Sequence, residues 1–295
     1  MSTKRKLVTV FVAILVVMAG IAWFRNDSRT KCCACKGKVI LLDGTSSVGK
    51  SAIIEEFRKL HPEYQIVKVD DWFPLDLKEI AERLGWSGDS AVNPWQFLKD
   101  YYISKDQYYL DTRLRTEIFK GMKSRGYMDE AKKRALHGNN VIIDTVLEDS
   151  TQYAIFEETF KDVPTEKVLV YCPLAILFDR VEKRNASADA AEHRTAFLSF
   201  EQFPALYKVR TSDSERLVDT VSTQELASLL GKSLEQLRAL GIPAGYESEL
   251  AQFEEQFISH FDIKNRDKIE LTPTRLYDRV LNSGSASPSQ LAQEL

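Results

Sequence analysis

The sequence is poor in the residues that build metal and disulfide sites, with only four cysteines and four histidines among 295 residues. The histidines are scattered, and none stands at a metal-ligand spacing from a cysteine or from another histidine, which argues against a zinc enzyme. The formal net charge of −3 lacks the basic excess of a general nucleic-acid-binding protein, so we expect no nucleic-acid partner. The 44% hydrophobic and 28% charged residues are ordinary for a folded globular domain.

The N-terminus carries a long apolar run, residues 7–24, in which Thr9 is the only polar residue. As a helix, these 18 residues would span about 27 Å, close to the thickness of a bilayer's hydrocarbon core. We therefore expect residues 1–24 to form an N-terminal transmembrane helix that contacts the membrane through residues 7–24. A cleaved signal peptide is the alternative, because the run has a basic front end and residues 20–22 resemble a small-x-small cleavage site.

Residues 25–37 follow as a basic linker that contains three of the four cysteines, Cys32, Cys33 and Cys35. Five basic residues lie within residues 25–38, against three before the apolar run, and this asymmetry favours a single-pass protein with its C-terminal domain in the cytoplasm. A secreted protein is the alternative. The cysteines are either acylated beside the membrane or remain an unmodified, reduced linker.

Short apolar runs that are followed by helical patterning recur through the rest of the chain. They are residues 38–43, 65–70, 140–144, 167–172 and 276–281. Uninterrupted Val/Ile/Leu runs of this length are typical of strands buried on both faces of a parallel sheet, and helical segments such as 51–60 and 174–183 supply the crossovers. The pattern predicts an α/β domain over residues 38–295 with a doubly wound, parallel, five-stranded sheet.

Two stretches are longer than crossovers require. Residues 71–139 hold three of the four tryptophans, and we interpret them as a cap that binds the acceptor substrate. Residues 211–272 are mostly of helical spacing, and we interpret them as a helical insertion before the last strand.

A phosphate-binding loop joins the first strand to the first helix. Its residues, which match G-x-x-x-x-G-K-[ST], are Gly44, Thr45, Ser46, Ser47, Val48, Gly49, Lys50 and Ser51. The glycines let successive backbone N–H groups point at phosphate oxygens, and the helix N-terminus favours negative charge. Lys50 is expected to reach the β- and γ-phosphates of ATP, and the Ser51 hydroxyl to bind Mg²⁺.

The absence of other motifs narrows the class of P-loop protein. No N-K-x-D segment for guanine recognition is present, and we find no signature segments of ABC-type or AAA-type motors. A small ATP-dependent kinase remains, in which a carboxylate near the γ-phosphate takes the proton of the acceptor hydroxyl. Asp70 and Asp71 end the second predicted strand and Asp144 ends the third, at the sheet edge where ligands bind.

The sequence leaves different alternative roles for Asp70 and for Asp144. Asp70 is the candidate base, with a turn or cap residue as its alternative. Asp144 either contacts Mg²⁺, in the manner of a Walker-B aspartate, or contacts the acceptor directly. Arg180 and Arg184 share one face of the helix after the fourth strand and could neutralise the transferring phosphoryl group, or simply pair with neighbouring acids. Arg194 is a weaker third candidate.

Together these segments resemble the chloramphenicol phosphotransferase-like family of P-loop kinases. L-L-D-G-T-S-S-V-G-K-S is similar to the family's P-loop, and V-K-V-D-D-W to its second-strand segment, which implies that Asp70 is the general base. G-N-N-V-I-I-D-T-V-L resembles the third-strand segment that ends at Asp144, and C-P-L-A-I-L-F-D-R-V-E-K-R-N the lid entry that carries Arg180 and Arg184. Y-D-R-V-L-N-S-G-S-A-S-P-S-Q-L-A-Q-E-L is similar to the closing strand and helix.

The sequence also departs from the family. The G-D-R that follows the lid arginines in the family is replaced here by residues 185–187, so one lid arginine is missing or displaced. An internal V-D-T at residues 218–220 offers a second alignment for the closing strand. The cap and the insertion have no counterpart in the small antibiotic kinase, so we do not expect the antibiotic to be the substrate. A membrane-tethered nucleotide switch without transfer chemistry and a secreted effector kinase are the alternative functions.

Overall fold

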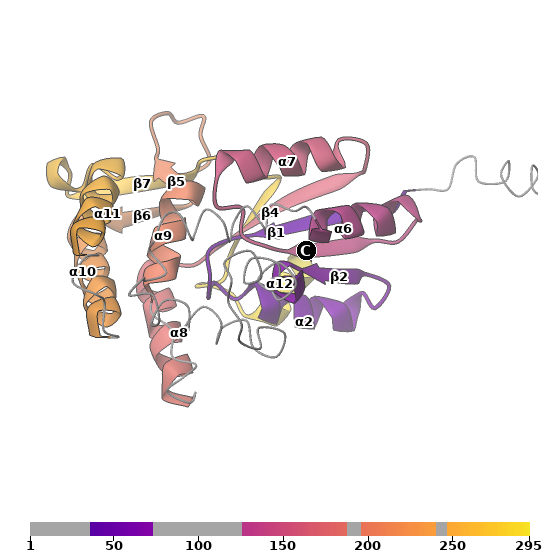
Figure 1. Ribbon diagram of the computed structural model, residues 1–295, viewed down its shortest axis with the longest axis horizontal. Coiled ribbons are helices and arrows are strands. Elements are labelled where there is room, and N and C mark those ends of the chain that lie inside the picture. The colour runs from indigo at the N-terminus through magenta and orange to yellow at the C-terminus, as the bar shows by residue number, and fades with distance from the viewer. Residues whose placement is uncertain (1–35, 73–125, 188–195, 240–246) are drawn as a thin grey trace, which may run out of the picture.

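The computed structural model describes residues 36–72, 126–187, 196–239 and 247–295 (Figure 1). The predicted anchor, Cys32, Cys33 and Cys35, and most of the predicted cap lie outside the described residues, as does Arg194. Within the described ranges, none of the helices is both long enough and apolar enough to cross a membrane.

The first of two sheets is parallel and has five strands in the order β2-β3-β1-β4-β8. Its strands are β1 (Val39–Asp43), β2 (Gln65–Lys68), β3 (Val141–Asp144), β4 (Thr165–Tyr171) and β8 (Arg279–Asn282). Each of the five apolar runs in the sequence therefore contributes a strand, and the predicted doubly wound α/β sheet is confirmed. Helices cover both of its faces: α2 (Lys50–Leu60), α6 (Gly126–Leu136), α7 (Ser150–Phe160), α8 (Leu174–Ser187) and α12 (Pro288–Glu294).

The central strand β1 is buried on both faces, which explains its unbroken apolar sequence. Val39 and Leu41 pack with residues of α6 and α7, whereas Ile40 and Leu42 pack on the opposite face with residues of α2, α8 and α12. All four side chains are at most 1% exposed. Burial of each such side chain stabilises the fold by about 2 kcal/mol, so the strand that leads into the P-loop is firmly held.

The second sheet is small and antiparallel, and the sequence analysis missed it. Its order is β5-β7-β6, with β5 (Tyr207–Val209), β6 (Asp219–Ser222) and β7 (Lys268–Pro273). Three helices and a short 3-10 turn pack around it: α9 (Phe197–Leu206), α10 (Thr223–Ala239), α11 (Glu247–His260) and η3 (Ile263–Asn265). Figure 1 shows α8 and α9 standing between the five-stranded sheet and the pair α10 and α11.

Three sequence interpretations change with these elements. The segment 211–272 contains the helices that we expected, but it also supplies β6 and most of β7. The V-D-T at residues 218–220 is therefore not the closing strand of the main sheet, because β6 pairs with β7 and β8 pairs with β4. The end of the predicted cap forms α6, which packs against β2 and β3 as a crossover helix.

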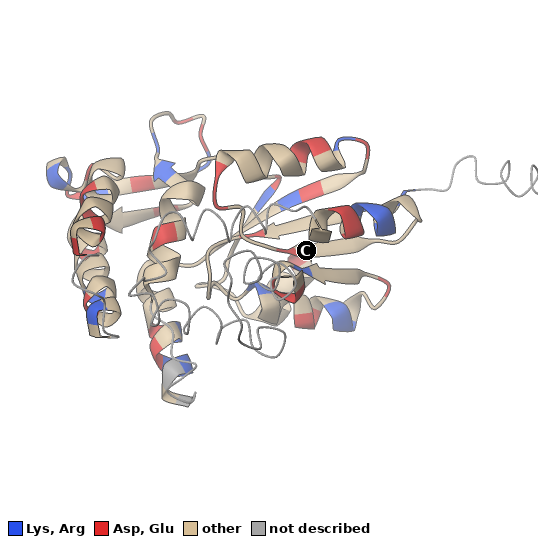
Figure 2. Ribbon diagram, in the orientation of Figure 1, with Lys and Arg blue, Asp and Glu red and all other residues tan. Residues whose placement is uncertain are grey.

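The closing helix has strong local signals. The Ser287 hydroxyl caps α12, the side-chain oxygen of Gln290 accepts from the Ser287 backbone N–H, and Pro288 occupies the first turn. Acidic and basic residues alternate along α10, whereas α11 has acidic residues but no lysine or arginine (Figure 2).

Candidate active site

The P-loop lies at the carboxyl edge of the main sheet, between β1 and α2. Gly44, Ser47 and Gly49 have positive φ angles of 152°, 63° and 101°. Gly44 cannot carry a side chain, because a Cβ atom there would lie 2.6 Å from the carbonyl oxygen of Val170. The left-handed conformation of Ser47 costs about 1–2 kcal/mol for a non-glycine residue, so the surrounding contacts must hold it. Alternation between right-handed and left-handed backbone conformations forms a concave nest of N–H groups that binds phosphate.

Lys50 is 8% exposed and folds back over the loop. Its Nζ atom donates to the carbonyl oxygens of Gly44 at 2.8 Å and Thr45 at 3.2 Å, and lies 4.0 Å from Oδ1 of Asp144. Burial lowers the pKa of Lys50, and the negative charges of Asp144, Asp43 and Asp70 act against that shift. The ammonium group therefore lies at the phosphate end of the loop, among the carboxylates that favour its charged form.

The side chains of Ser51 and Asp144, both predicted to bind Mg²⁺, lie within hydrogen-bond distance of each other. The Ser51 hydroxyl, in the first turn of α2, donates to Oδ2 of Asp144 at 3.1 Å. Asp144 ends β3 opposite Leu42 of β1, and it is 8% exposed. Burial raises the pKa of the Asp144 carboxyl, opposed chiefly by Lys50 and by the hydrogen bond from Ser51. Hydroxyl and carboxylate oxygens suit Mg²⁺, which completes its shell with phosphate oxygens and water.

The described residues include no group of three or more His, Cys, Asp or Glu side chains that could hold a metal unaided. A magnesium ion here would thus depend on the nucleotide for further ligands, as is usual for this ion.

Asp70 lies at the same sheet edge, but not at the end of a strand. Strand β2 ends at Lys68, and residues 69–72 form a helical turn in which Asp70 and Asp71 are exposed. Burial has the largest effect on the pKa of both Lys50 and Asp144. The negative charge of Asp70 makes a smaller contribution, which acts to raise both pKa values. The charge of Asp70 therefore acts on both groups, and its role as the base for the acceptor hydroxyl stays a prediction.

Arg180 contacts the P-loop from its outer side. One guanidinium nitrogen, Nη1, donates to the carbonyl oxygen of Val48 at 2.8 Å and to the Ser283 hydroxyl at 3.1 Å, and Nη2 donates to the carbonyl oxygen of Ser283. The Ser283 hydroxyl also donates to Val48 at 2.6 Å. Arg180 thus ties α8 to the loop backbone and to the segment after β8. A role above the γ-phosphate stays a prediction for Arg180 and for Arg184, which is exposed one turn further along α8.

A buried carboxylate, which no sequence motif had indicated, lies at the base of the P-loop. Asp43 is 0% exposed; its Oδ1 accepts from the backbone N–H groups of Gly44 at 2.9 Å and Leu147 at 3.0 Å, and its Oδ2 accepts from the Tyr277 hydroxyl at 2.7 Å. Arg275 lies 3.7 Å from the same Oδ2 atom. Burial raises the pKa of the Asp43 carboxyl, and the hydrogen bonds and nearby cations oppose the shift.

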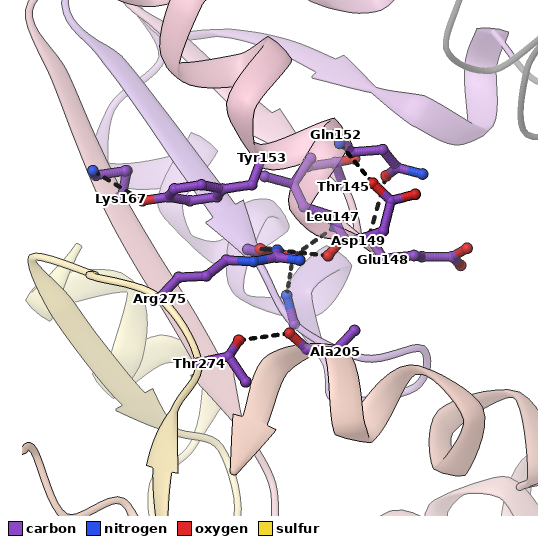
Figure 3. A network of polar contacts seen from close by, with 12 residues as sticks. Thr145, Leu147, Glu148, Asp149, Gln152, Tyr153, Lys167, Ala205, Thr274 and Arg275 are labelled. Atoms are coloured by element: carbon purple, nitrogen blue, oxygen red, sulfur yellow. Dashed lines mark hydrogen bonds and ion pairs between the residues drawn. The ribbon is translucent and has the colours of Figure 1, made fainter. Parts of the chain in front are cut away.

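Figure 3 shows how Arg275 reaches this region. Its guanidinium group lies beside the ring of Tyr153, 5.1 Å from the centroid, and donates to the carbonyl oxygen of Leu147 at 2.6 Å. The connection between β7 and β8 is thereby fixed to the loop after β3. Only the three-dimensional fold brings these residues together, because Tyr277 and Asp43 are 234 positions apart.

Two residues of α9, Ser199 and Gln202, also contact the P-loop and were missed. The Ser199 hydroxyl donates to the carbonyl oxygen of Ser46 at 2.9 Å, and Oε1 of Gln202 accepts from the Ser46 N–H at 2.7 Å. No local sequence signal marks these residues, because they lie 153 and 156 positions from Ser46 along the chain.

Comparisons with known proteins agree with a P-loop domain. A family model described as an AAA domain matches residues 40–196, just over half of the chain. A search of curated proteins gave no match. Among solved structures, the APS kinase CysC of Mycobacterium tuberculosis, in complex with AMPPNP and APS, is 13% identical with a TM-score of 0.40, covering 88% of this chain and 95% of its own.

A gluconokinase from Sinorhizobium meliloti 1021 is 14% identical with a TM-score of 0.33, covering 57% of this chain and 75% of its own. Likenesses this distant carry no argument about activity. The resemblance to the chloramphenicol phosphotransferase-like family stays a prediction, because the matching model has another description. Because the matching model covers more than half of the residues, the chain belongs to the AAA domain family.

Proposed function

We propose that the chain is an ATP-dependent kinase that transfers the γ-phosphoryl group of ATP to a hydroxyl group of a small molecule or a protein. One observation carries the proposal. Lys50, Ser51 and Asp144 converge at the mouth of the P-loop, and the charge of Asp70 acts on two of them. A carboxylate beside the phosphate-binding groups can accept the proton of an attacking hydroxyl, which phosphoryl transfer requires.

Each of these groups has a defined task in phosphoryl transfer. The backbone N–H groups of the loop bind the phosphates, and Lys50 exchanges its bonds to Gly44 and Thr45 for phosphate oxygens. Ser51 and Asp144 would hold Mg²⁺, which neutralises negative charge on the phosphates. Asp70 accepts the proton of the acceptor hydroxyl as the oxygen–phosphorus bond forms and the bond from the γ-phosphorus to the bridging oxygen breaks, releasing ADP.

The proposal is tested by ATP turnover of the full chain and of three variants. Lys50→Ala should lower turnover by at least about a hundredfold, because it removes a cation from the transferring phosphates. Asp70→Asn should leave ATP affinity within about threefold of wild type but lower transfer by about a hundredfold. Asp71→Asn is the matched control, since Asp71 is the exposed neighbour of Asp70.

The outcomes separate transfer chemistry from a nucleotide switch. Unchanged ATP turnover in the Lys50→Ala variant would refute the kinase. ATP binding without any activity that depends on Asp70 would instead support a membrane-tethered switch or adaptor. Incubation of a metabolite extract with γ-labelled ATP, compared between wild type and Asp70→Asn, would identify the labelled acceptor.

The setting of the reaction is a second part of the proposal. Residues 1–24 anchor the chain as a single-pass membrane protein, and the kinase domain lies on the cytoplasmic side, where ATP is available. The 18-residue apolar run and its flanking basic residues support this arrangement. Fractionation of the producing cell tests it: intact chain in the membrane pellet supports the anchor, whereas a shortened chain in the medium would support a secreted effector.

A further inference from the structure

Helix α9 has two faces that serve different parts of the molecule. Its phenylalanines pack on α11 and the residue that follows α11, with ring centroids 5.0 Å apart for Phe197–Phe253, 5.8 Å for Phe200–Phe257 and 5.5 Å for Phe203–Phe261. On its other face, polar side chains of α9 contact the P-loop. Ser199 and Gln202, which make those contacts, are 1% and 5% exposed. A buried glutamine without partners would be costly, so its bonds are part of the architecture.

The peptide group between Thr45 and Ser46 is held at both of its polar atoms. Its carbonyl oxygen accepts from Nζ of Lys50 at 3.2 Å, and its N–H donates to Oε1 of Gln202 at 2.7 Å. If Lys50 turns to the phosphates, as proposed above, the bond to Gln202 is the one of these two contacts that can remain on the peptide. Ser199 restrains the next peptide through the Ser46 carbonyl oxygen. That peptide precedes Ser47, whose left-handed conformation shapes the phosphate nest.

Gln202 is itself fixed by a charged partner. Its Nε2 atom donates to Oε1 of Glu148 at 2.8 Å, and this bond determines which end of the amide faces the loop. Glu148 follows β3, where its backbone N–H donates to Oε1 of Gln152 in α7 at 3.1 Å and where Asp149 caps that helix. The relay Glu148–Gln202–Ser46 therefore joins a rigid helix start to the P-loop through α9.

We propose that Gln202 is a positioning residue, which transmits the fixed orientation of Glu148 to the Thr45–Ser46 peptide and so keeps the P-loop in the shape that binds ATP. The inference rests on the proposed use of the P-loop for ATP, but not on phosphoryl transfer or on the identity of the acceptor.

The test measures ATP affinity by calorimetry on the full chain, together with thermal unfolding without nucleotide. Gln202→Met keeps the length of the side chain but neither accepts from Ser46 nor donates to Glu148. We expect it to bind ATP about tenfold more weakly at a temperature where it is fully folded. The matched control is Gln236→Met in α10, because Gln236 accepts from the N–H of Ala196 at 3.4 Å, at the start of α9 and not at the P-loop. Its ATP affinity should stay within about twofold of wild type.

Variants of Glu148 separate a relay from a direct effect of its charge. Glu148→Gln retains an oxygen that accepts from Gln202 and should bind ATP within about threefold of wild type, whereas Glu148→Met should match the tenfold loss of Gln202→Met. Wild-type affinity in Gln202→Met, an equal loss in Gln236→Met, or equal losses in the two Glu148 variants would each overturn the inference. If the wild-type chain bound no ATP, the proposed function itself would be refuted. The differences among the variants test the role of Gln202 and not the proposed function.

Discussion

Asp43 and Asp144 end neighbouring parallel strands at the same edge of the sheet, yet their surroundings differ in kind. Protein donors surround Asp43: two backbone N–H groups, the Tyr277 hydroxyl and the nearby Arg275. Asp144 has a hydroxyl from Ser51 and the Lys50 ammonium at 4.0 Å, both of which are expected to bind the nucleotide or its metal. One carboxylate therefore serves the shape of the P-loop, and the other serves its chemistry.

The largest expected difference between them is catalytic. Asp144→Asn should lower the kcat of ATP turnover by about a hundredfold, because a neutral amide is a poor ligand for Mg²⁺. Asp43→Asn should stay within about fivefold of wild type, since the amide oxygen can still accept from Gly44 and Leu147. Asp129→Asn, at an exposed position in the first turn of α6, controls for the loss of one negative charge. Equal losses for Asp43→Asn and Asp144→Asn would remove the distinction.

The second difference concerns stability. Asp43→Ala leaves the Tyr277 hydroxyl and two backbone N–H groups without an acceptor inside the protein, and it should lower the free energy of unfolding by about 3 kcal/mol. Asp144→Ala should lower it by less than about 1 kcal/mol, because Ser51 is exposed and can bind water instead. Urea unfolding followed by circular dichroism measures both changes. A larger loss of stability for Asp144→Ala than for Asp43→Ala would show that Asp144, and not Asp43, has the structural role.

The sequence was informative wherever a function depends on neighbours along the chain. The strand runs and the P-loop residues follow from local patterns. The position of Asp144 at the edge of the sheet beside the P-loop was also expected, because a parallel sheet brings the ends of adjacent strands together. The same local reasoning could not find the partners of Asp43, since its tyrosine comes from the far end of the chain. Gln202 is similarly distant, 156 positions from the peptide that it binds.

Arg180 and the second sheet show the other limit of local reasoning. An arginine at helical spacing has the same pattern whether it faces phosphates or a backbone carbonyl, and only the position of Ser283 settles its present contacts. Strands β5 and β6 have three and four residues, too short for their alternation to stand out from the helices around them. Residues 211–272 were accordingly interpreted as helical.

The smallest expected effect is a shared pH dependence, which tests whether burial disfavours the charge of both carboxylates. Burial raises the pKa of Asp43 and of Asp144 above the ordinary value of 3.8, so each folded carboxyl keeps its proton at pH values where the unfolded chain has lost it. Unfolding then releases a proton, and raising the pH from 3.8 through the folded pKa favours the unfolded chain. Asparagine does not titrate, so each Asp→Asn variant should gain stability relative to wild type over that range.

Urea unfolding of wild type, Asp43→Asn and Asp144→Asn at several pH values from about 4.5 to 7.5 measures this gain. A difference that grows with pH for both variants would show that the two carboxylates are alike in their desolvation and differ only in their partners. A gain that shrinks with pH for Asp43→Asn would mean that Arg275, Lys50 and the hydrogen bonds outweigh burial at that site. Asp43 would then be a charged anchor of the P-loop, and its asparagine variant should lose ATP affinity as well.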